Sequence, residues 1–430
     1  MTNISRRKLF GNTGTAAAAA TAFTIIKPEL VRGQGKARLK AGLVGCGGRG
    51  TQAIADMMDG SENVDVVAMG DLFEDRLEGS LRNLRARQDF AKHLDRLKVD
   101  PDKRFVGFEA YKKVLASDID IVMLCTPPGY RPMHFEAAVD AKKHVFCEKP
   151  FGTDPVGVRR FMAAVKKSEE LKLTVMSGAQ RRNDPNYIVT LDKIRNGAIG
   201  DINSLYAYWV GTPVIQQKAR DPKWGDMTWQ HRAWYSFLWI CGDQIVEQHL
   251  HNIDVCNWLM GTHPVEVLAM GGAAWRPRQE IYGSIFDHIA ADFVYPNGVR
   301  MSSYCRQYEV DAKAAQADRI ATNVSEMIVG SKGRSNGHDM NGNAATRPYM
   351  HEHTAMISSI RGDGPYVNHG MAVAESTMTC IMAREAAYSG LKITWEMIMN
   401  SQQNLMPKAF GYDEKMEAPP LPVPGKYKFV

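Results

Sequence analysis

The chain has 430 residues, more than one ordinary core accommodates, so we expect two domains. Its 44% hydrophobic and 23% charged residues are typical of a globular protein and exclude a disordered or fibrous one. The net charge of +6 is small and its cations are spread along the chain, which argues against nucleic-acid binding. The seven cysteines are scattered without a CxxC pair, so we predict neither a disulfide framework nor a zinc site.

The N-terminus resembles a twin-arginine export signal. Arg6 and Arg7 precede an alanine-rich, weakly apolar stretch at 16–26 that is too short to span a bilayer stably. We therefore predict a signal peptide over 1–36, a periplasmic protein and no stable membrane insertion. The alternative is a chance pair of arginines in a tail. The resemblance also implies export in the folded state, often around a bound cofactor.

Strands and helices alternate after this segment. Apolar runs typical of buried strands and of the helices between them occur at 39–44, 51–58, 64–69, 119–125, 132–141 and 144–147. This alternation predicts an α/β fold, with a Rossmann-type doubly wound parallel sheet over 37–152.

The pattern becomes richer in strands after about residue 200. Two apolar runs at 290–295 and 299–304 are joined through Pro-Asn-Gly, which is a hairpin signal. A late helix is expected at 371–388, and we expect it to pack back on the Rossmann domain. We therefore predict an α+β domain over 153–430, with a large, mainly antiparallel open sheet that binds substrate and carries an oligomer contact.

A glycine-rich turn directly follows the first expected strand. Gly45, Gly47 and Gly50 form GxGxxG between a strand and a helix, where glycines permit a tight turn and bring a pyrophosphate to the helix N-terminus. Asp71 ends the second strand, where a carboxylate binds ribose hydroxyls and repels a 2′-phosphate. The sequence therefore predicts NAD in preference to NADP; the alternative is a glycine-rich turn without a nucleotide.

Two further segments follow expected strands. Glu148-Lys149-Pro150 stands where open α/β sheets bind ligands, and Lys149 there can bind a substrate hydroxyl and stabilise an alkoxide. Arg181 and Arg182 follow another strand and are candidate substrate contacts. The alternatives are an ordinary surface lysine and a solvated pair of arginines.

A third segment carries acids and histidines at helical spacing. If residues 242–254 are helical, Glu247 and His251 lie on one face and Asp254 follows three residues later. A histidine held by a carboxylate suits a general base that takes an alcohol proton. His249 with these groups could indicate a metal, but residues two apart point to different helix faces, so we predict no metal site.

Tryptophan is concentrated between these segments. Trp224, Trp229, Trp234 and Trp239 are four of the eight tryptophans of the chain. Aromatic faces stack on the C–H face of a sugar ring, and the neighbouring His231 and Arg232 could reach hydroxyls. A packed helix or an oligomer contact is the alternative.

Together these elements resemble the Gfo/Idh/MocA oxidoreductases. The resemblance covers the whole mature chain, through GCGGRG and Asp71, the Thr126-Pro127 turn with His134, Glu148-Lys149-Pro150 and the His251 to Asp254 segment. It implies that Lys149 and His251 are catalytic. The family commonly has an aspartate four residues before this histidine, whereas this chain has Glu247, so the role of Glu247 stays open.

The resemblance also implies the extent of the site. The expected cofactor contacts are Gly45, Gly47, Gly48, Arg49, Gly50, Asp71, Thr126, Pro127, His134, Glu148, Lys149 and Gln180. The expected substrate contacts are Arg181, Arg182, Trp234, His249 and Asp254, with Glu247 a catalytic candidate.

The expected activity is NAD(P)-dependent hydride transfer at a CH–OH carbon of a sugar, glycoside or polyol, with a tightly bound, internally recycled cofactor. His251 would take the hydroxyl proton and Lys149 would polarise the oxygen. The alternative is a redox-neutral, NAD-dependent glycosidase that oxidises, eliminates and hydrates, although such relatives usually lack Glu-Lys-Pro. We also expect a homodimer or homotetramer. The sugar, the ring carbon and the direction of reaction stay open.

Overall fold

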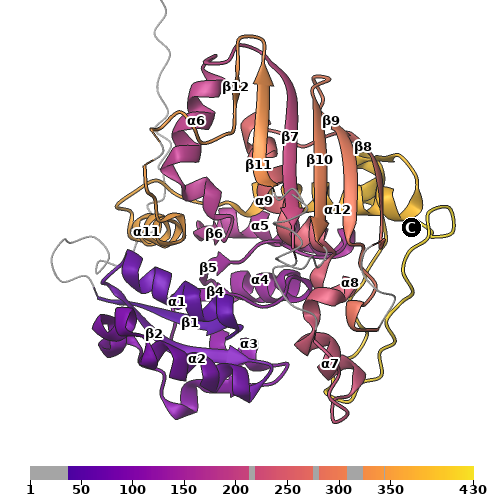
Figure 1. The fold of residues 1–430 in the computed structure, drawn as a ribbon. Helices are drawn as coiled ribbons and strands as arrows, with labels where there is room; N and C mark the ends of the chain where they lie inside the picture. Colours follow the sequence, from indigo (N-terminus) through magenta and orange to yellow (C-terminus); the bar gives the residue numbers. More distant parts are fainter. Residues whose placement is uncertain (1–36, 213–217, 275–279, 308–322, 343) are drawn as a thin grey trace, which may run out of the picture. The chain divides into compact units, whose positions relative to one another are not determined.

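The computed structural model of the chain describes residues 37–212, 218–274, 280–307, 323–342 and 344–430. The predicted export signal at 1–36 lies outside these residues. Residues 38–430 form one unit built around two sheets (Figure 1).

The first sheet is parallel and has the strand order β3-β2-β1-β4-β5-β6. In chain order its strands are Leu39–Val44 (β1), Val64–Asp71 (β2), Arg104–Val106 (β3), Ile121–Leu124 (β4), His144–Cys147 (β5) and Val175–Ser177 (β6). The order reverses between β1 and β4, which places a ligand crevice at the carboxyl ends of the strands. The predicted Rossmann sheet is thereby confirmed. The domain boundary at 152 stays a prediction, and β6 of this sheet follows it.

Helices cover this sheet. They are Gly48–Gly60 (α1), Glu74–Ala86 (α2), Ala110–Leu115 (α3), Arg131–Asp140 (α4) and Pro155–Glu170 (α5), with 3-10 turns at Gln88–Arg96 (η2), Pro101–Lys103 (η3), Pro128–Tyr130 (η4) and Gln180–Asn183 (η5). All four residues of β4 are buried, because neighbouring strands and covering helices leave a central parallel strand no free face. Its apolar run in the sequence reflects this burial.

The second sheet is mainly antiparallel and has the order β12-β11-β7-β10-β9-β8-β13. Its strands are Ile202–Gly211 (β7), Glu266–Gly272 (β8), His288–Val294 (β9), Arg300–Gln307 (β10), Asn323–Gly330 (β11), Arg334–Ser335 (β12) and Ile393–Thr394 (β13). β7 and β10 pair in parallel, whereas β9 and β10 form the predicted hairpin. The α+β architecture is confirmed.

The remaining helices include the one predicted late in the chain. They are Pro185–Arg195 (α6), Asp226–Arg232 (α7), Leu238–Cys241 (α8), Leu250–Met260 (α9), Pro348–Arg361 (α11), Gly370–Ser389 (α12) and Trp395–Asn400 (α13), with a π-helical turn at Ile245–His249 (η7) and 3-10 turns at Trp234–Ser236 (η6) and Glu280–Tyr282 (η8). α12 packs against α5 and β8, and Thr377 accepts the Phe151 N–H at 3.1 Å. None of the described helices is long and apolar enough to cross a membrane.

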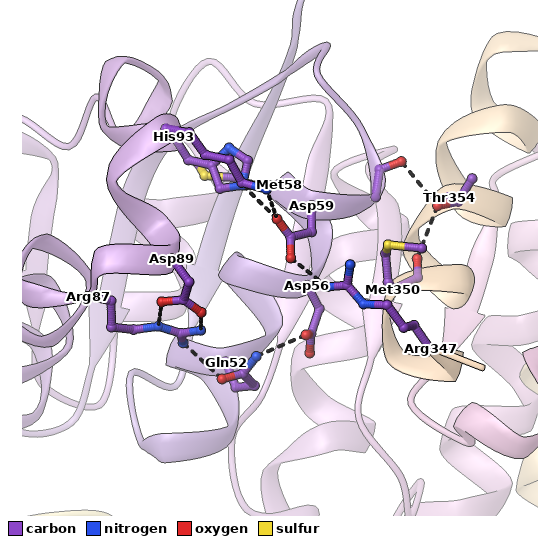
Figure 2. A network of polar contacts seen from close by, with 12 residues as sticks. Gln52, Asp56, Met58, Asp59, Arg87, Asp89, His93, Arg347, Met350 and Thr354 are labelled. Atoms are coloured by element: carbon purple, nitrogen blue, oxygen red, sulfur yellow. Dashed lines mark hydrogen bonds and ion pairs between the residues drawn. The ribbon is translucent and has the colours of Figure 1, made fainter. Parts of the chain in front are cut away.

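α11 returns from the second sheet and docks on α1 (Figure 2). Asp59 at the end of α1 binds Arg347 at 2.6 Å and the Nε2 of His93 at 2.8 Å. The hydroxyl of Thr354 donates to the carbonyl of Gly60 at 3.0 Å. This docking places residues of α11 beside the glycine-rich turn at the start of α1.

α9 is tied to the first sheet by a buried ion pair. The guanidinium of Arg182 donates to both carboxylate oxygens of Asp254, each at 2.8 Å, and these side chains are only 9% and 3% exposed. Ser376 on α12 donates to the same carboxylate at 2.8 Å. The pair therefore joins η5, α9 and α12.

Removing one partner of this pair tests its structural role. Asp254→Ala should lower the free energy of unfolding by about 3–5 kcal/mol, because the Arg182 charge would stay buried without compensation. Arg300→Ala breaks a pair with Asp292 whose side chains are 57% and 41% exposed, and should cost less than about 1 kcal/mol. Urea denaturation measures both; an equal loss in the two variants would contradict the structural role of the buried pair.

Candidate active site

A cavity of about 680 Å³ opens at the carboxyl ends of the strands of the first sheet. It is lined by the glycine-rich turn, the ends of β2, β4 and β5, and the η7–α9 segment. The residues predicted from the sequence that line it are Gly45, Gly47, Gly48, Arg49, Gly50, Asp71, Thr126, Pro127, His134, Glu148, Lys149, Trp234, Glu247 and His251.

The three glycines of the turn have different physical roles. Gly45 has a φ of +97°, and a Cβ there would lie 2.6 Å from the carbonyl carbon of Cys125. A Cβ on Gly50 would lie 2.0 Å from the carbonyl oxygen of Gly45, so only glycine permits this approach of helix to strand. A Cβ on Gly47 would meet nothing within 4 Å, which leaves open space at the start of α1 where a pyrophosphate fits.

Asp71 is fixed at the end of β2 by two backbone groups. Its Oδ2 accepts the N–H of Cys46 at 2.6 Å, and its Oδ1 accepts the N–H of Phe73 at 2.9 Å. Burial raises the pKa of Asp71, and these two hydrogen bonds oppose that rise. Because a carboxylate has about four acceptor sites, both oxygens keep capacity for the ribose hydroxyls of a dinucleotide. The glycine turn and Asp71 therefore fit NAD.

His134 closes the cavity at the β4 end. Its Nδ1 lies 3.3 Å from the hydroxyl of Thr126, and its ring stacks on Tyr111 with centroids 4.2 Å apart. Burial lowers the pKa of His134 to about 3, so the ring is neutral. It therefore lines the cavity as a largely apolar ring whose Nδ1 faces Thr126.

Arg49 is enclosed by carboxylates. Its Nε donates to Glu148 at 2.5 Å, its Nη1 to Asp56 at 3.1 Å, and its Nη2 to Glu352 of α11 at 3.4 Å. A Cβ on Gly178 would lie 2.4 Å from Oε2 of Glu148, so glycine at the end of β6 makes room for this carboxylate. Arg49 and Glu148 thus line the cavity as an ion pair.

Lys149 is held by the π-helical turn. Its Nζ donates to the carbonyl oxygen of Glu247 at 2.5 Å and lies 3.3 Å from Oε1 of the same residue. The two side chains are 9% and 7% exposed. Burial raises the pKa of Glu247, and the charge of Lys149 counteracts this rise.

His251 lies four residues further along the segment and lines the same cavity. Burial lowers its pKa well below the usual value, and the positive charges of Lys149 and Arg181 lower it further. The imidazole is therefore neutral and able to accept a proton. The expected contact between Glu247 and His251 is not formed: Oε2 of Glu247 and Nδ1 of His251 are both buried without a hydrogen-bond partner.

The π-helical turn changes which residues face the cavity. We expected an ordinary helix, but η7 widens the backbone by one residue before α9 begins. Glu247, Gln248 and His251 all line the cavity as a result, and Gln248 was missed in the sequence. His249 instead points to β10, where its Nε2 lies 2.8 Å from the hydroxyl of Ser303. Among the described residues no group of three or more His, Cys, Asp or Glu side chains could hold a metal ion.

Five predicted site residues lie outside the cavity lining: Gln180, Arg181, Arg182, His249 and Asp254. Arg181 pairs with the buried Glu326 of β11, and Arg182 pairs with Asp254. Buried charges require partners, and here each arginine finds a carboxylate of the protein. The cofactor role of Gln180 and the substrate roles of the other four stay predictions. None of these five residues lines the cavity.

The tryptophan-rich segment is mainly a small core. Trp229 and Trp239 are 2% and 4% exposed and pack with Phe237, whereas Trp234 lines the cavity. His231 and Arg232 also line it. The packing alternative therefore holds for two of the four tryptophans, and Trp234 remains a candidate ligand contact.

A family model matches the part of the chain that forms the parallel sheet. Residues 39–177 match the family model GFO_IDH_MocA, described as an oxidoreductase family with an NAD-binding Rossmann fold. An inositol 2-dehydrogenase of Rhizobium meliloti is 29% identical over 36% of this chain and 40% of its own length. A myo-inositol 2-dehydrogenase of Thermotoga maritima is 25% identical over 54% of this chain and 58% of its own. The chain thus spans about half the length of the curated relatives it matches.

Solved structures share the whole two-sheet fold. A scyllo-inositol dehydrogenase from Lactobacillus casei with bound NAD(H) and scyllo-inositol matches with a TM-score of 0.60 and 17% identity, over 83% of this chain and 99% of that one. An aldose-aldose oxidoreductase from Caulobacter crescentus matches with a TM-score of 0.62 and 16% identity, over the same shares. At these identities the likeness establishes the fold alone.

The glycine turn generates a paired prediction. Gly50→Ala should lower the melting temperature, because its Cβ would collide with the Gly45 carbonyl. Gly47→Ala should leave the melting temperature unchanged and weaken NAD binding on the order of tenfold, because its methyl group would enter the open space. Thermal melts and calorimetric NAD titrations measure these effects. Native NAD affinity in Gly47→Ala would show that the pyrophosphate binds elsewhere.

Asp71 generates a prediction on cofactor preference. Asp71→Ala should weaken NAD binding by about tenfold and strengthen NADP binding, because the carboxylate that binds the ribose also repels a 2′-phosphate. Titrations of wild type and variant with both cofactors give the ratio of the two dissociation constants. An unchanged ratio would remove Asp71 from the ribose site.

Proposed function

We propose that this chain, whose residues 39–177 match the NAD-binding Rossmann domain of the Gfo/Idh/MocA oxidoreductases, transfers hydride between NAD and a CH–OH carbon of a sugar, glycoside or polyol. The observation that carries the proposal is the convergence of Lys149 and His251 on the cavity that also holds the glycine turn and Asp71. The polyol class is supported by the names of the inositol dehydrogenases to which the chain is similar.

Lys149 supplies the electrophile. An ammonium has three donors, and the contacts with Glu247 use at most two of them. The remaining N–H can donate to the substrate oxygen and stabilise the negative charge that develops as the C–H bond breaks. Glu247 is then a positioning residue, which fixes Lys149 through its carbonyl and partly balances its charge.

His251 supplies the base. Its neutral imidazole accepts the hydroxyl proton during oxidation and returns it during reduction. The chemistry that NAD supplies when bound is acceptance of the hydride. Oxidation of the alcohol would give a carbonyl, with the hydroxyl proton held by His251 and the hydride accepted by bound NAD.

Lys149→Met and His251→Ala should each lower turnover by a factor on the order of 10² or more, with NAD affinity nearly unchanged. Lys143→Met is the matched control, because Lys143 also donates to a backbone carbonyl, that of Ile119 at 2.7 Å, but does not line the cavity. The measurement is reduced-nicotinamide absorbance with inositols, aldoses and glycosides as substrates. Native rates in either variant would refute its catalytic role. Glycoside cleavage without net NADH would support the redox-neutral glycosidase instead.

We further propose that the chain is exported by the twin-arginine signal at 1–36, works in the periplasm and assembles as a homodimer or homotetramer. The support for export is the arginine pair before an alanine-rich stretch. A periplasm is not expected to supply fresh nicotinamide, so a protein exported with its cofactor must return the hydride within each cycle.

This proposal predicts a retained cofactor. Protein isolated from the periplasm should carry about one NAD(H) per chain through gel filtration and release it on denaturation, because tight retention means slow dissociation. Absorbance and mass spectrometry of the released nucleotide measure the stoichiometry. Periplasmic protein that is free of cofactor and turns over only with added NAD would contradict internal recycling.

A further inference from the structure

One wall of the cavity comes from outside the Rossmann domain. Asp71, Phe73 and Phe108 line the cavity near the ends of β2 and β3, on the side where the adenosine ribose binds. His231 and Arg232 of α7 line the same cavity. A dinucleotide whose ribose reaches Asp71 would therefore lie between the Rossmann sheet and α7.

α7 is fastened to the loop that follows β2 and to the first turn of α2. The guanidinium of Arg232 donates to both carboxylate oxygens of Asp75, at 2.6 and 2.7 Å, and its Cζ lies 3.7 Å from the centre of the Phe73 ring. The hydroxyl of Tyr412, in the C-terminal segment, donates to the carbonyl of Leu72 at 2.7 Å. Two independent contacts thus hold this loop and the first turn of α2.

The C-terminal segment backs α7 along its length. Thr228 donates to the carbonyl of Tyr412 at 2.7 Å, and Gln230 donates to the carbonyl of Met416 at 2.6 Å. Figure 1 shows this segment, in yellow, running beside α7. Trp229 of α7 and the C-terminal Leu405, Met406 and Met416 belong to one small apolar core, together with the neighbouring Trp224 and Trp239. The density of tryptophan in the sequence reflects this core.

His231 connects α7 to the start of α4. Its Nδ1 lies 2.6 Å from the carbonyl oxygen of Met227, which can only accept, so Nδ1 carries the proton. Its Nε2 must then accept from the hydroxyl of Tyr130, at 2.6 Å. Burial lowers the pKa of His231 to about 4, which keeps this arrangement intact near neutral pH. Both nitrogens of His231 are therefore occupied, and none is free for a ligand.

We infer that residues 226–234 and 405–418 form a strap that closes the adenosine half of the cofactor site, and that NAD enters and leaves only when the strap opens. The strap consists of α7 with η6 and of the C-terminal segment packed behind it. Its latch is a pair of contacts, Tyr412 with Leu72 in the β2–α2 loop and Arg232 with Asp75 in the first turn of α2. The inference rests on NAD binding in this cavity and is independent of the substrate.

Two mild variants release the latch. Asp75→Asn weakens the ion pair, and its side chain is 61% exposed and does not line the cavity. Tyr412→Phe removes one hydroxyl. Their matched controls are Asp89→Asn, whose exposed carboxylate binds Arg87 through both oxygens, and Tyr366→Phe, whose hydroxyl donates to the carbonyl of Leu173 at 3.0 Å.

The measurement is stopped-flow NADH fluorescence on the full chain freed of nucleotide. Mixing the protein with NADH gives the association rate, and mixing the NADH complex with excess NAD gives the rate at which NADH dissociates. Each latch variant should accelerate both association and dissociation of NADH by about fivefold, and the double variant should accelerate them further. The reason is that a larger fraction of molecules with an open strap lets the nucleotide enter and leave faster. The dissociation constant should change less than about threefold, and the controls should match wild type. Melting temperatures verify that all variants are folded.

Other outcomes overturn the inference. Faster dissociation with unchanged association would mean that Arg232 and Tyr412 merely contribute binding energy. Unchanged rates in the double variant would mean that the strap does not control passage. If the wild-type protein binds no NADH, both the strap and the proposed function fail, whereas normal NADH binding without turnover of any polyol leaves the strap standing and refutes the substrate class alone.

Discussion

The buried contact between Lys149 and Glu247 joins the two halves of the site. Lys149 follows β5 of the Rossmann sheet, and the carbonyl that it binds at 2.5 Å belongs to the π-helical turn before α9. A buried ammonium needs acceptors, so this contact fixes the turn over the edge of the sheet. α9 directly follows this turn and brings His251 to the cavity that the glycine-rich loop also lines. The groups proposed to face the cofactor and those proposed to face the substrate are therefore positioned by the same contact.

The same charge also affects the protonation of His251. Burial lowers the pKa of His251 most strongly, and the positive charge of Lys149 acts in the same direction. A neutral imidazole has a lone pair free for a proton, although burial and the charge of Lys149 both disfavour the imidazolium that protonation would form. In the proposed reaction Lys149 would orient the oxygen of the substrate, and the neutral His251 would take its proton. Glu247 partly balances the charge of Lys149 and forms no hydrogen bond with His251. Its proposed role is therefore to position Lys149.

The sequence was sufficient to predict those parts of the site whose signal lies within a few neighbouring residues. The glycine fingerprint, Asp71 and the Glu148-Lys149 pair each follow an apolar strand, and the structure places them on one cavity. Arg182 and Asp254 form a buried ion pair in the structure, and the sequence could not distinguish such a pair from a ligand contact, because both use the same residue types. The π-helical turn has no periodic signature, so Gln248 was missed. The strap depends on contacts such as that of Tyr412 with Leu72, which are 340 residues apart and invisible to local patterns.

Single-turnover mixing of the NAD-loaded protein with inositols and aldoses deuterated on the carbinol carbons tests hydride transfer most directly. We expect reduced nicotinamide to appear at the rate of substrate oxidation, slowed by the deuterium and carrying one deuterium by mass spectrometry. A redox-neutral cycle would make this species transient, so absorbance is followed from the first milliseconds. Conversion of a substrate with no reduced nicotinamide at any time, or with nicotinamide that carries no deuterium, would contradict hydride transfer at this site.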